Sequence, residues 1–303
     1  MYKRQVLTGQ GWEQFELPAR AHGGLLLSLC NLAPLAMRRA VTMIHDAQTF
    51  IAPESYSRAF GTFYRTVQPM IGRRHLRILT VSDFSARELV RYGVAPSERI
   101  RVIRNGVDHV ARTIPDRTIL TRLGLAPRSY VLALSSAQAH KNIRVLLRAF
   151  AEPAMAGLRL VLFGSTTAAE LATAGLVLPA NVLCAGRLSD EALAALMADA
   201  LCFAMPSTTE GFGLPPLEAM AQGCPAVVAP CGALPEVCGD AALYAHPDRP
   251  DEWLQAISTL AGNPDIRARH VALSRRQAAR MTWERAGDAL IAVLREVVEE
   301  SRR

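Results

Sequence analysis

Short apolar runs alternate with segments of helical periodicity along most of the chain, and this alternation predicts parallel α/β sheets. In the first part, apolar runs at residues 41–45 and 76–81 flank residues 54–70, whose apolar positions recur every three or four residues. Ser82 or Asp83 then provides a helix cap, and Asn105-Gly106 is typical of a turn. The strands expected here are residues 25–30, 41–45, 76–81 and 100–103, and the helices are residues 54–70 and 83–91.

A polar stretch with two prolines, residues 112–128, interrupts this alternation before it starts again. The later strands are expected at residues 130–134, 158–163, 182–185, 200–205 and 226–229, and the helices after Asn142, at residues 189–198, from Leu214, and at residues 253–260, 266–280 and 283–298. A chain of 303 residues is long enough for about two domains. The sequence therefore predicts an N-terminal α/β domain (residues 1–118), a second α/β domain (residues 119–282) and a C-terminal helix (residues 283–303) that could return to the first domain.

Several classes of protein are excluded by the composition. No run of about 18 apolar residues is present, and the N-terminal decapeptide lacks the apolar segment of a signal peptide. The six cysteines form neither a C-x-x-C pair nor a cluster with histidines. Reduced thiols in a cytoplasmic protein are therefore expected.

The net charge of +7 is concentrated in the first part of the chain. Residues 1–125 carry 18 Lys and Arg against 9 Asp and Glu, whereas residues 126–303 carry 16 against 18. Such a charge suggests an anionic partner, which could be nucleic acid, a phospholipid surface or a phosphorylated acceptor. The densest basic cluster, residues 73–77, has no interleaved aromatic residues, so we expect no nucleic-acid partner. A solvated surface explains this cluster as well as a membrane contact does.

The most informative stretch is residues 206–230, PSTTEGFGLPPLEAMAQGCPAVVAP, at a strand-to-helix turn. Gly211 and Gly213 bracket Phe212 and allow the backbone to approach a ligand closely. The helix that starts at Leu214 has free N–H groups and a partial positive charge, which suit a phosphate.

Two carboxylates flank this turn, Glu210 before the glycines and Glu218 inside the helix. Carboxylates accept hydrogen bonds from vicinal hydroxyls and repel phosphate, so we expect them to bind the sugar and ribose parts of a ligand. Alternatively, each glutamate could be a solvated charge that favours the helix N-terminus.

Two basic residues are further candidates for the site. Lys141 lies at a strand-to-helix junction and is one of only two lysines, so we interpret it as a diphosphate contact rather than a surface lysine. His45 ends an expected strand and precedes Asp46. By residue type alone, His45 could form structural hydrogen bonds or act in catalysis.

Residues 206–230 resemble the E-x7-E signature of the retaining glycosyltransferases of family four. The resemblance extends from about Val41 to Ala292 and includes the segments His45-Asp46, Ser82–Ser85 and Asn105–Asp108. It implies the GT-B architecture, in which two doubly wound Rossmann-like domains face each other across a cleft. The usual opening strand and glycine-rich loop are not evident, so we expect the N-terminal domain to be incomplete and the chain to be N-terminally shortened. Ser135 and Ser136 also replace a glycine and an arginine often found in the family.

The resemblance implies that a sugar passes from a nucleotide diphosphate to an acceptor hydroxyl with retention of anomeric configuration. It assigns catalytic roles to His45, which would orient the sugar, and to Glu210, which would hold the donor sugar hydroxyls. Glu218 would bind the ribose. The other donor-binding residues are expected to be Lys141, Gly211, Phe212, Gly213 and Leu214.

Surface polysaccharide or glycolipid synthesis is the process that the resemblance suggests. The expected partners are a nucleotide-sugar donor, a lipid-linked or saccharide acceptor and, as a peripheral contact, the anionic inner face of the cell membrane. No D-x-D pair occurs in the sequence, so we expect no essential metal and no cofactor beyond the nucleotide-sugar co-substrate.

Two alternatives stay open at this point. A non-catalytic nucleotide-sugar binding protein, or an inactive truncated homologue, would keep the second-domain signature without the first-domain cleft. A basic nucleic-acid-binding α/β protein would explain the charge but not the combination of Glu210, Gly213 and Glu218.

Overall fold

The computed structural model describes residues 7–21 and 23–300, which form two compact units. Residues Met1–Arg104 and Glu284–Arg303 make up the first unit, and residues Asn105–Trp283 make up the second. Residues 105–118, which the sequence pattern assigns to the first domain, belong to the second unit. They do so partly because Val107 N donates to Met281 O at 2.9 Å.

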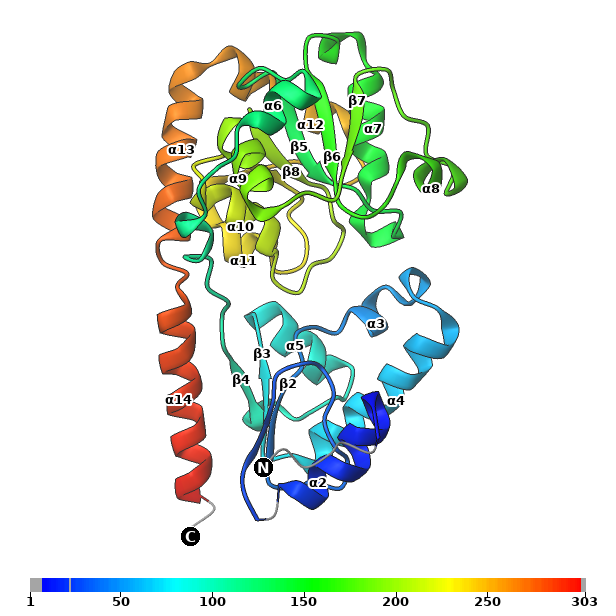
Figure 1. The fold of residues 1–303 in the computed structure, drawn as a ribbon, viewed down its shortest axis with the longest axis vertical. Helices are drawn as coiled ribbons and strands as arrows, with labels where there is room; N and C mark the ends of the chain where they lie inside the picture. Colours follow the sequence, from blue (N-terminus) through cyan, green and yellow to red (C-terminus); the bar gives the residue numbers. More distant parts are fainter. Residues whose placement is uncertain (1–6, 22, 301–303) are drawn as a thin grey trace. The chain divides into compact units, whose positions relative to one another are not determined.

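The first unit is built on a four-stranded parallel sheet with the strand order β1-β2-β3-β4 (Figure 1). Its strands are β1 (Leu26–Ser28), β2 (Ala40–Met43), β3 (Arg77–Thr80) and β4 (Ile100–Val102). Its helices are α1 (Gly9–Gly11), a π-helical turn (Trp12–Glu16), α2 (Leu17–Arg20), α3 (Gln48–Ile51), α4 (Arg58–Arg74), α5 (Asp83–Arg91) and α14 (Trp283–Glu300), whose first residue is assigned to the second unit. Apolar residues of β3, α4 and α5 form the core, among them Ile71, Ile78 and Leu89.

Helix α4 runs from Arg58 to Arg74 and so is shifted relative to the expected residues 54–70. It begins at Arg58 rather than Glu54, because the Ser57 hydroxyl caps it by accepting a hydrogen bond from Phe60 N. Its apolar stripe is also only partly covered, since Phe60 and Phe63 are each 43% exposed. The rings of Phe60 and Tyr64 stack instead, with centroids 4.3 Å apart.

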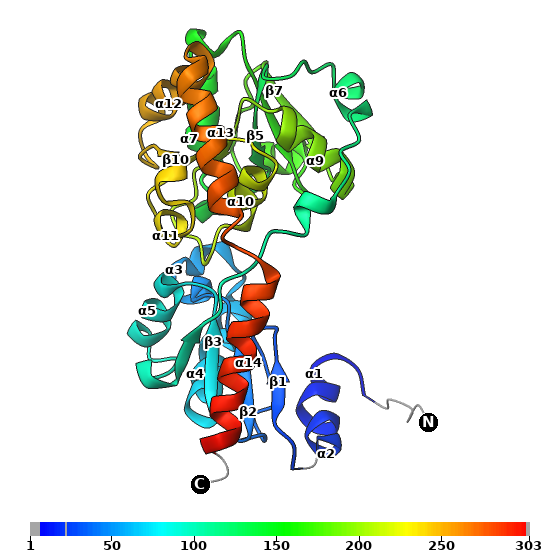
Figure 2. The same cartoon turned by 90° about the vertical axis from the view of Figure 1, so that its left-hand side faces the viewer.

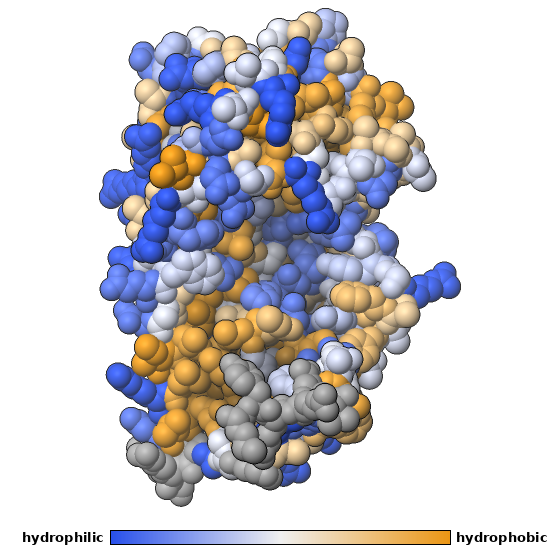
Figure 3. Space-filling view, in the orientation of Figure 1, coloured by the Kyte–Doolittle hydropathy of each residue, from blue (hydrophilic) through white to orange (hydrophobic). Residues whose placement is uncertain are grey.

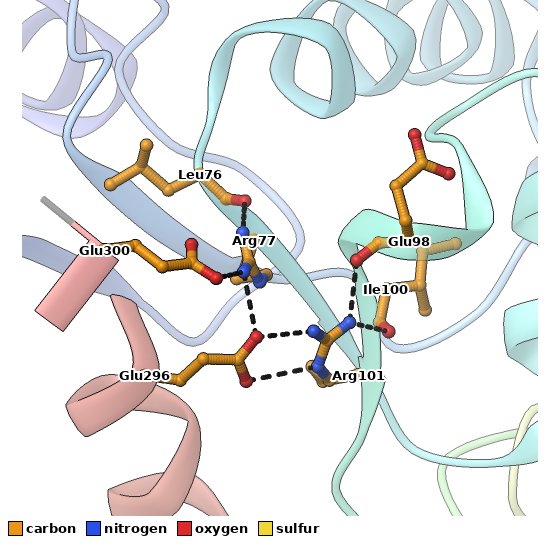
Figure 4. Close-up of polar contacts among 7 residues, drawn as sticks. All are labelled: Leu76, Arg77, Glu98, Ile100, Arg101, Glu296 and Glu300. Atoms are coloured by element: carbon orange, nitrogen blue, oxygen red, sulfur yellow. Dashed lines mark hydrogen bonds and ion pairs between the residues drawn. The ribbon is translucent and has the colours of Figure 1, made fainter. Parts of the chain in front are cut away.

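The C-terminal helix α14 is tied to the sheet of the first unit by ion pairs (Figure 4). Glu296 accepts hydrogen bonds from Arg77 of β3 at 2.8 Å and from Arg101 of β4 at 2.5 Å. Glu300 also pairs with Arg77. Hydrogen bonds from Arg101 and Arg77 lower the pKa of Glu296, so this carboxylate stays charged at neutral pH. Residues far apart in the sequence are thus joined in one unit.

The second unit is a six-stranded parallel sheet with the order β10-β9-β8-β5-β6-β7. Its strands are β5 (Tyr130–Leu134), β6 (Arg159–Phe163), β7 (Val182–Gly186), β8 (Cys202–Met205), β9 (Ala226–Val228) and β10 (Ala242–Tyr244). Its helices are α6 (Thr118–Leu123), α7 (Ile143–Ala151), α8 (Ala168–Thr173), α9 (Asp190–Asp199), α10 (Leu214–Ala221), α11 (Leu234–Cys238), α12 (Pro250–Gly262) and α13 (Pro264–Ala278). Helices cover both faces of the sheet, with α7 packed beside α12 and α6 beside α9 (Figure 2).

The predicted fold class is confirmed, since both units are parallel α/β sheets and every expected strand is present. The pattern missed several short elements, which are at most six residues long and give little periodic signal: α1, α2, α3, α6, α8, α11 and β10. The turn expected at Asn105-Gly106 is wrong, because these residues have no regular structure and the turn lies at Asp108 and His109. Gly106 is needed for a different reason: a Cβ atom there would lie 2.2 Å from Trp283 N.

Among the residues that the structure describes, none of the helices combines the length and the apolar composition needed to cross a bilayer.

Candidate functional site

The sheet of the second unit has a topological switch point between β5 and β8. From β5 the chain continues to β6 on one side, whereas from β8 it continues to β9 on the other. Loops diverge at such a point and leave a crevice at the carboxyl ends of the strands, where parallel α/β sheets bind ligands. The two loops are joined by a hydrogen bond from Thr208 N to His140 O at 2.8 Å and by one from the Asn142 side chain to Pro206 O at 3.2 Å.

Two of the predicted site residues meet at this switch point. The Lys141 ammonium, from the β5 loop, lies 2.8 Å from Oε1 of Glu210, from the β8 loop. Glu210 is only 7% exposed, and the Lys141 side chain is 20% exposed. Without a ligand, each charge is therefore satisfied mainly by the other. The sequence alone placed them on different parts of a ligand and gave no sign that they would pair.

The backbone of Glu210 is fixed by a close packing contact with Gly232. Ala233 N donates to Glu210 O at 2.9 Å. A Cβ atom at Gly232 would lie 2.4 Å from Glu210 N, and Gly232 has a φ of +62°, which L side chains rarely adopt. Position 232 therefore requires glycine for both space and conformation.

The N-terminus of α10 offers few backbone N–H donors to a ligand. Gly213 precedes the helix in the left-handed region, with φ 95° and ψ 54°, and no side chain caps the helix. The first four N–H positions of a helix have no partner within it, but two of these four belong to prolines, at 215 and 216. The donors left for a ligand are thus the amides of Gly213 and Leu214. The neighbouring Phe212 is buried, with 5% exposure.

Glu218 lies on α10 at the edge of a pocket of about 100 Å³. Its side chain is 24% exposed, and its Oε1 atom is 3.8 Å from Nε2 of His109. Burial raises the pKa of Glu218, and the charge of Asp190 raises it further, whereas His109 lowers it. The pocket is lined in part by His109, Val110, Thr113, Asp190, Leu193 and Glu218.

The two serines that depart from the family pattern are engaged within the protein. The Ser135 hydroxyl donates to Thr166 O at 2.7 Å, and the Ser136 hydroxyl accepts from Gln138 N at 3.2 Å. Within the described part of the β5 loop, Lys141 is therefore the side chain best suited to an anion.

His45 belongs to the first unit and follows β2. Its ring Nε2 lies 3.0 Å from Leu29 O, and its backbone N donates to Asn31 Oδ1 at 2.8 Å. A carbonyl oxygen only accepts hydrogen bonds, so Nε2 must carry the proton and Nδ1 of the neutral ring is left as an acceptor. The catalytic role of His45 stays a prediction.

The remaining family-like segments have structural roles. Ser82 caps α5 by accepting from Ser85 N at 3.0 Å. The Asp108 carboxylate accepts from Trp283 N at 2.7 Å. Among the described residues, no group of three or more His, Cys, Asp and Glu side chains is placed to hold a metal ion. The metal-independence expected from the sequence stays a prediction.

Two family descriptions match the chain. Residues 128–263 match "Glycosyl transferases group 1", and residues 19–110 match "Glycosyltransferase Family 4". O-antigen chain mannosyltransferase B of Escherichia coli is 34% identical over 266 residues, which cover 83% of this chain and 68% of that protein. D-inositol 3-phosphate glycosyltransferase of Segniliparus rotundus is 29% identical over 276 residues, which cover 85% of this chain and 62% of that protein.

Solved structures agree on the fold. Sucrose-phosphate synthase from Thermosynechococcus elongatus matches with a TM-score of 0.75 at 18% identity, over 94% of this chain and 77% of that one. WaaG, a glycosyltransferase involved in lipopolysaccharide biosynthesis, matches with a TM-score of 0.70 at 14% identity, over 91% of this chain and 80% of that one.

The two parallel α/β units and these structural matches define the GT-B fold. The chain belongs to glycosyltransferase family 4, as its motifs predict. It spans 62% to 68% of the length of these two curated relatives.

Proposed function

We propose that the chain transfers a sugar from a nucleoside-diphosphate donor to a hydroxyl of a saccharide or lipid-linked acceptor, with retention of anomeric configuration. The observation that carries the proposal is the group at the switch point of the second unit. There, the Lys141 ammonium pairs with the Glu210 carboxylate after β5 and β8, the same β8 loop leads into the uncapped N-terminus of α10, and Glu218 lies further along that helix. Cations and N–H donors suit a diphosphate, and carboxylates suit the hydroxyls of the attached sugars.

Lys141 and the amides of Gly213 and Leu214 would stabilise the diphosphate as it leaves, which is where negative charge develops. Because Lys141 is paired with Glu210 before the donor binds, an arriving diphosphate competes for the ammonium. Glu210 would then be free to accept hydrogen bonds from hydroxyls of the donor sugar. Glu218 would bind the ribose, and His45 would orient the sugar. None of these roles requires a metal ion.

The relatives support the substrate classes. O-antigen chain mannosyltransferases occur among the similar proteins, from Escherichia coli and Salmonella typhimurium. A HepE protein of Anabaena, whose fold is similar with a TM-score of 0.72 at 20% identity, has been crystallised with UDP. We therefore assign the chain to surface polysaccharide or glycolipid synthesis in the cytoplasm.

The test is calorimetric titration of UDP, GDP and ADP, with sugar transfer or donor hydrolysis followed in parallel. One nucleotide should bind tightly, and Glu218→Ala should weaken it roughly tenfold or more, because a hydrogen bond to a charged group contributes about 1.5–3 kcal/mol. Glu191→Ala is the matched control, since Glu191 is an exposed glutamate of α9. Tight binding without turnover would favour a non-catalytic nucleotide-sugar binding protein, and no binding would contradict the proposal.

We also infer that the first unit contacts the anionic inner face of the cell membrane. Helix α4 carries four arginines and no acidic residue, and it exposes Phe60 and Phe63. Figure 3 shows apolar surface at the lower right, where α4 lies. Exposed aromatic rings beside arginines match the boundary between lipid headgroups and acyl chains.

Co-sedimentation with vesicles checks this contact. The chain should bind vesicles that contain anionic phospholipid and not purely zwitterionic ones, and salt should weaken the binding. Replacing Phe60 and Phe63 together by serine should lower the bound fraction severalfold, because their apolar area no longer enters the lipid. Val90→Ser on α5 is the control, since Val90 is similarly exposed at 40%. Equal sedimentation of both variants would contradict the role of α4.

A further inference from the structure

An imidazole that the sequence motifs did not single out faces the Glu218 carboxylate. His109 follows directly after the Asn105–Asp108 segment, and its Nε2 atom lies 3.8 Å from Glu218 Oε1. The next residue is tied to α10, because the Gln222 side chain donates to Val110 O at 2.9 Å. The backbone that carries His109 is therefore fixed relative to the helix that carries Glu218.

Trp283 determines which ring nitrogen of His109 faces the carboxylate. The indole Nε1 of Trp283 lies 3.0 Å from His109 Nδ1. An indole N–H can only donate, so Nδ1 accepts and the proton of the neutral imidazole is on Nε2. Trp283 is itself held in place, since its backbone N donates to the Asp108 carboxylate at 2.7 Å. The N–H of His109 thus points toward Glu218 and not away from it.

Glu218 needs such a neighbour because its other surroundings disfavour a charge. Burial is the main cause of its raised pKa, and Asp190 at the start of α9 adds repulsion. Among the described residues of the elements packed against α10, the titratable groups that act on this carboxyl are Asp190 and His109, and only His109 lowers its pKa. The 3.8 Å separation is longer than a hydrogen bond, so the attraction in the ligand-free protein is electrostatic.

We propose that His109 is a positioning residue for Glu218: held by Trp283 with its Nε2–H toward the carboxylate, it orients that carboxylate for the ribose hydroxyls of a nucleoside diphosphate. The inference rests on the role of Glu218 in the proposed function. A carboxylate offers about four lone-pair sites, so one oxygen can face the imidazole while the other accepts from the ribose. His109 itself does not touch the nucleotide in this arrangement.

The experiment is calorimetric titration of UDP, GDP and ADP between pH 5 and pH 8 with the wild-type chain and with His109→Gln. At pH 7, His109→Gln should bind the preferred nucleotide roughly fivefold more weakly, because the ring N–H that faces the partly exposed Glu218 carboxylate is removed. Loss of the imidazole raises the pKa of Glu218 further, so the fall in affinity on acidification should begin at a higher pH than in the wild type. A merely structural role of His109 would not move that pH dependence.

Two further variants sharpen the test. Trp283→Phe keeps an aromatic ring but removes the indole N–H, so it should weaken binding in the same direction and by less than His109→Gln. His270→Gln is the matched control, because its ring contacts Ala241 O on another part of the second unit. It should match the wild type in affinity and in pH dependence.

The outcomes separate this inference from the proposed function. Unchanged affinity and pH dependence in His109→Gln, with binding weakened by Glu218→Gln, would overturn the positioning role and leave the proposed function standing. If the wild-type chain binds no nucleotide, the proposed function fails instead. In that case, carbon-13 NMR titration of the Glu218 carboxyl in the ligand-free protein tests whether His109 interacts with Glu218. An equal pKa of Glu218 in the wild type and in His109→Gln would overturn that interaction.

Discussion

Replacing Lys141 by methionine is expected to lower the rate of sugar transfer about a hundredfold or more, since removing one preorganised contact to a developing negative charge typically has that effect. We expect a large effect because few other groups could replace Lys141 in binding the diphosphate. Prolines remove two of the four N–H positions at the start of α10, and the Ser135 hydroxyl already donates its proton to Thr166 O. The measurement is kcat/KM for the nucleotide-sugar donor, together with the affinity for the free nucleoside diphosphate.

Lys141→Met also leaves the Glu210 carboxylate buried without its partner, which by itself would destabilise the second unit. The double variant with Glu210→Gln separates the two effects: it should recover thermal stability without recovering affinity for the free nucleoside diphosphate. Arg148→Met serves as the control, because Arg148 is an exposed cation one to two turns along α7. Turnover of Lys141→Met within threefold of the wild type would contradict the assigned role.

Gly232→Ala is expected to be strongly disruptive, because a backbone clash and a positive φ coincide at this position. The new Cβ would lie 2.4 Å from Glu210 N and 2.6 Å from Glu210 O, so the backbone of the β8 loop would have to move. We expect a loss of roughly 3 kcal/mol or more of unfolding free energy from strain and overpacking together. Turnover should fall with it, since Glu210 would be displaced from Lys141.

Gly124→Ala isolates the contribution of backbone conformation. Gly124 has a φ of +61°, close to that of Gly232, but a Cβ atom at this position would have no described neighbour within 4 Å. This control should therefore lose only about 1 kcal/mol, the usual cost of a left-handed conformation for alanine. Thermal unfolding of the two variants gives the comparison, and an equal loss in both would show that contact with Glu210 is unimportant.

The fold was largely predictable because parallel sheets leave a strong signal in sequence. A strand buried on both faces, such as β5 or β6, is a continuous apolar run, and the amphipathic helices between such runs are easily recognised. Short elements at the margins, such as β10 and α11, were not predictable, because three to five residues carry no period. The partial exposure of Phe60 and Phe63 could not be predicted from the sequence either. Hydrophobic periodicity shows which residues share the apolar face of a helix, but not which other elements cover that face.

The candidate site was predictable in its parts but not in its pairings. Glycines, prolines and two spaced glutamates identify the turn before α10 from local sequence alone. The ion pair of Lys141 with Glu210 joins residues 69 positions apart, and the bond of His109 with Trp283 joins residues 174 apart. Such contacts depend on the order of the strands in the sheet and on where the C-terminal part of the chain packs. Local sequence patterns encode neither. The nearest signal for His109 was the Asn105–Asp108 segment, which ends one residue before it.

The ion pairs of α14 have a consequence for the order in which the protein folds as it is synthesised. The second unit is one continuous stretch, so all of its strands and most of its contacts are available once residue 283 has left the ribosome. In contrast, Arg77 and Arg101 of the first unit cannot form their ion pairs until Glu296 has been synthesised. Glu296 lies nearly two hundred positions after Arg101 in the chain. Domains generally fold as units in the order in which they emerge, but here the unit that emerges first is completed last.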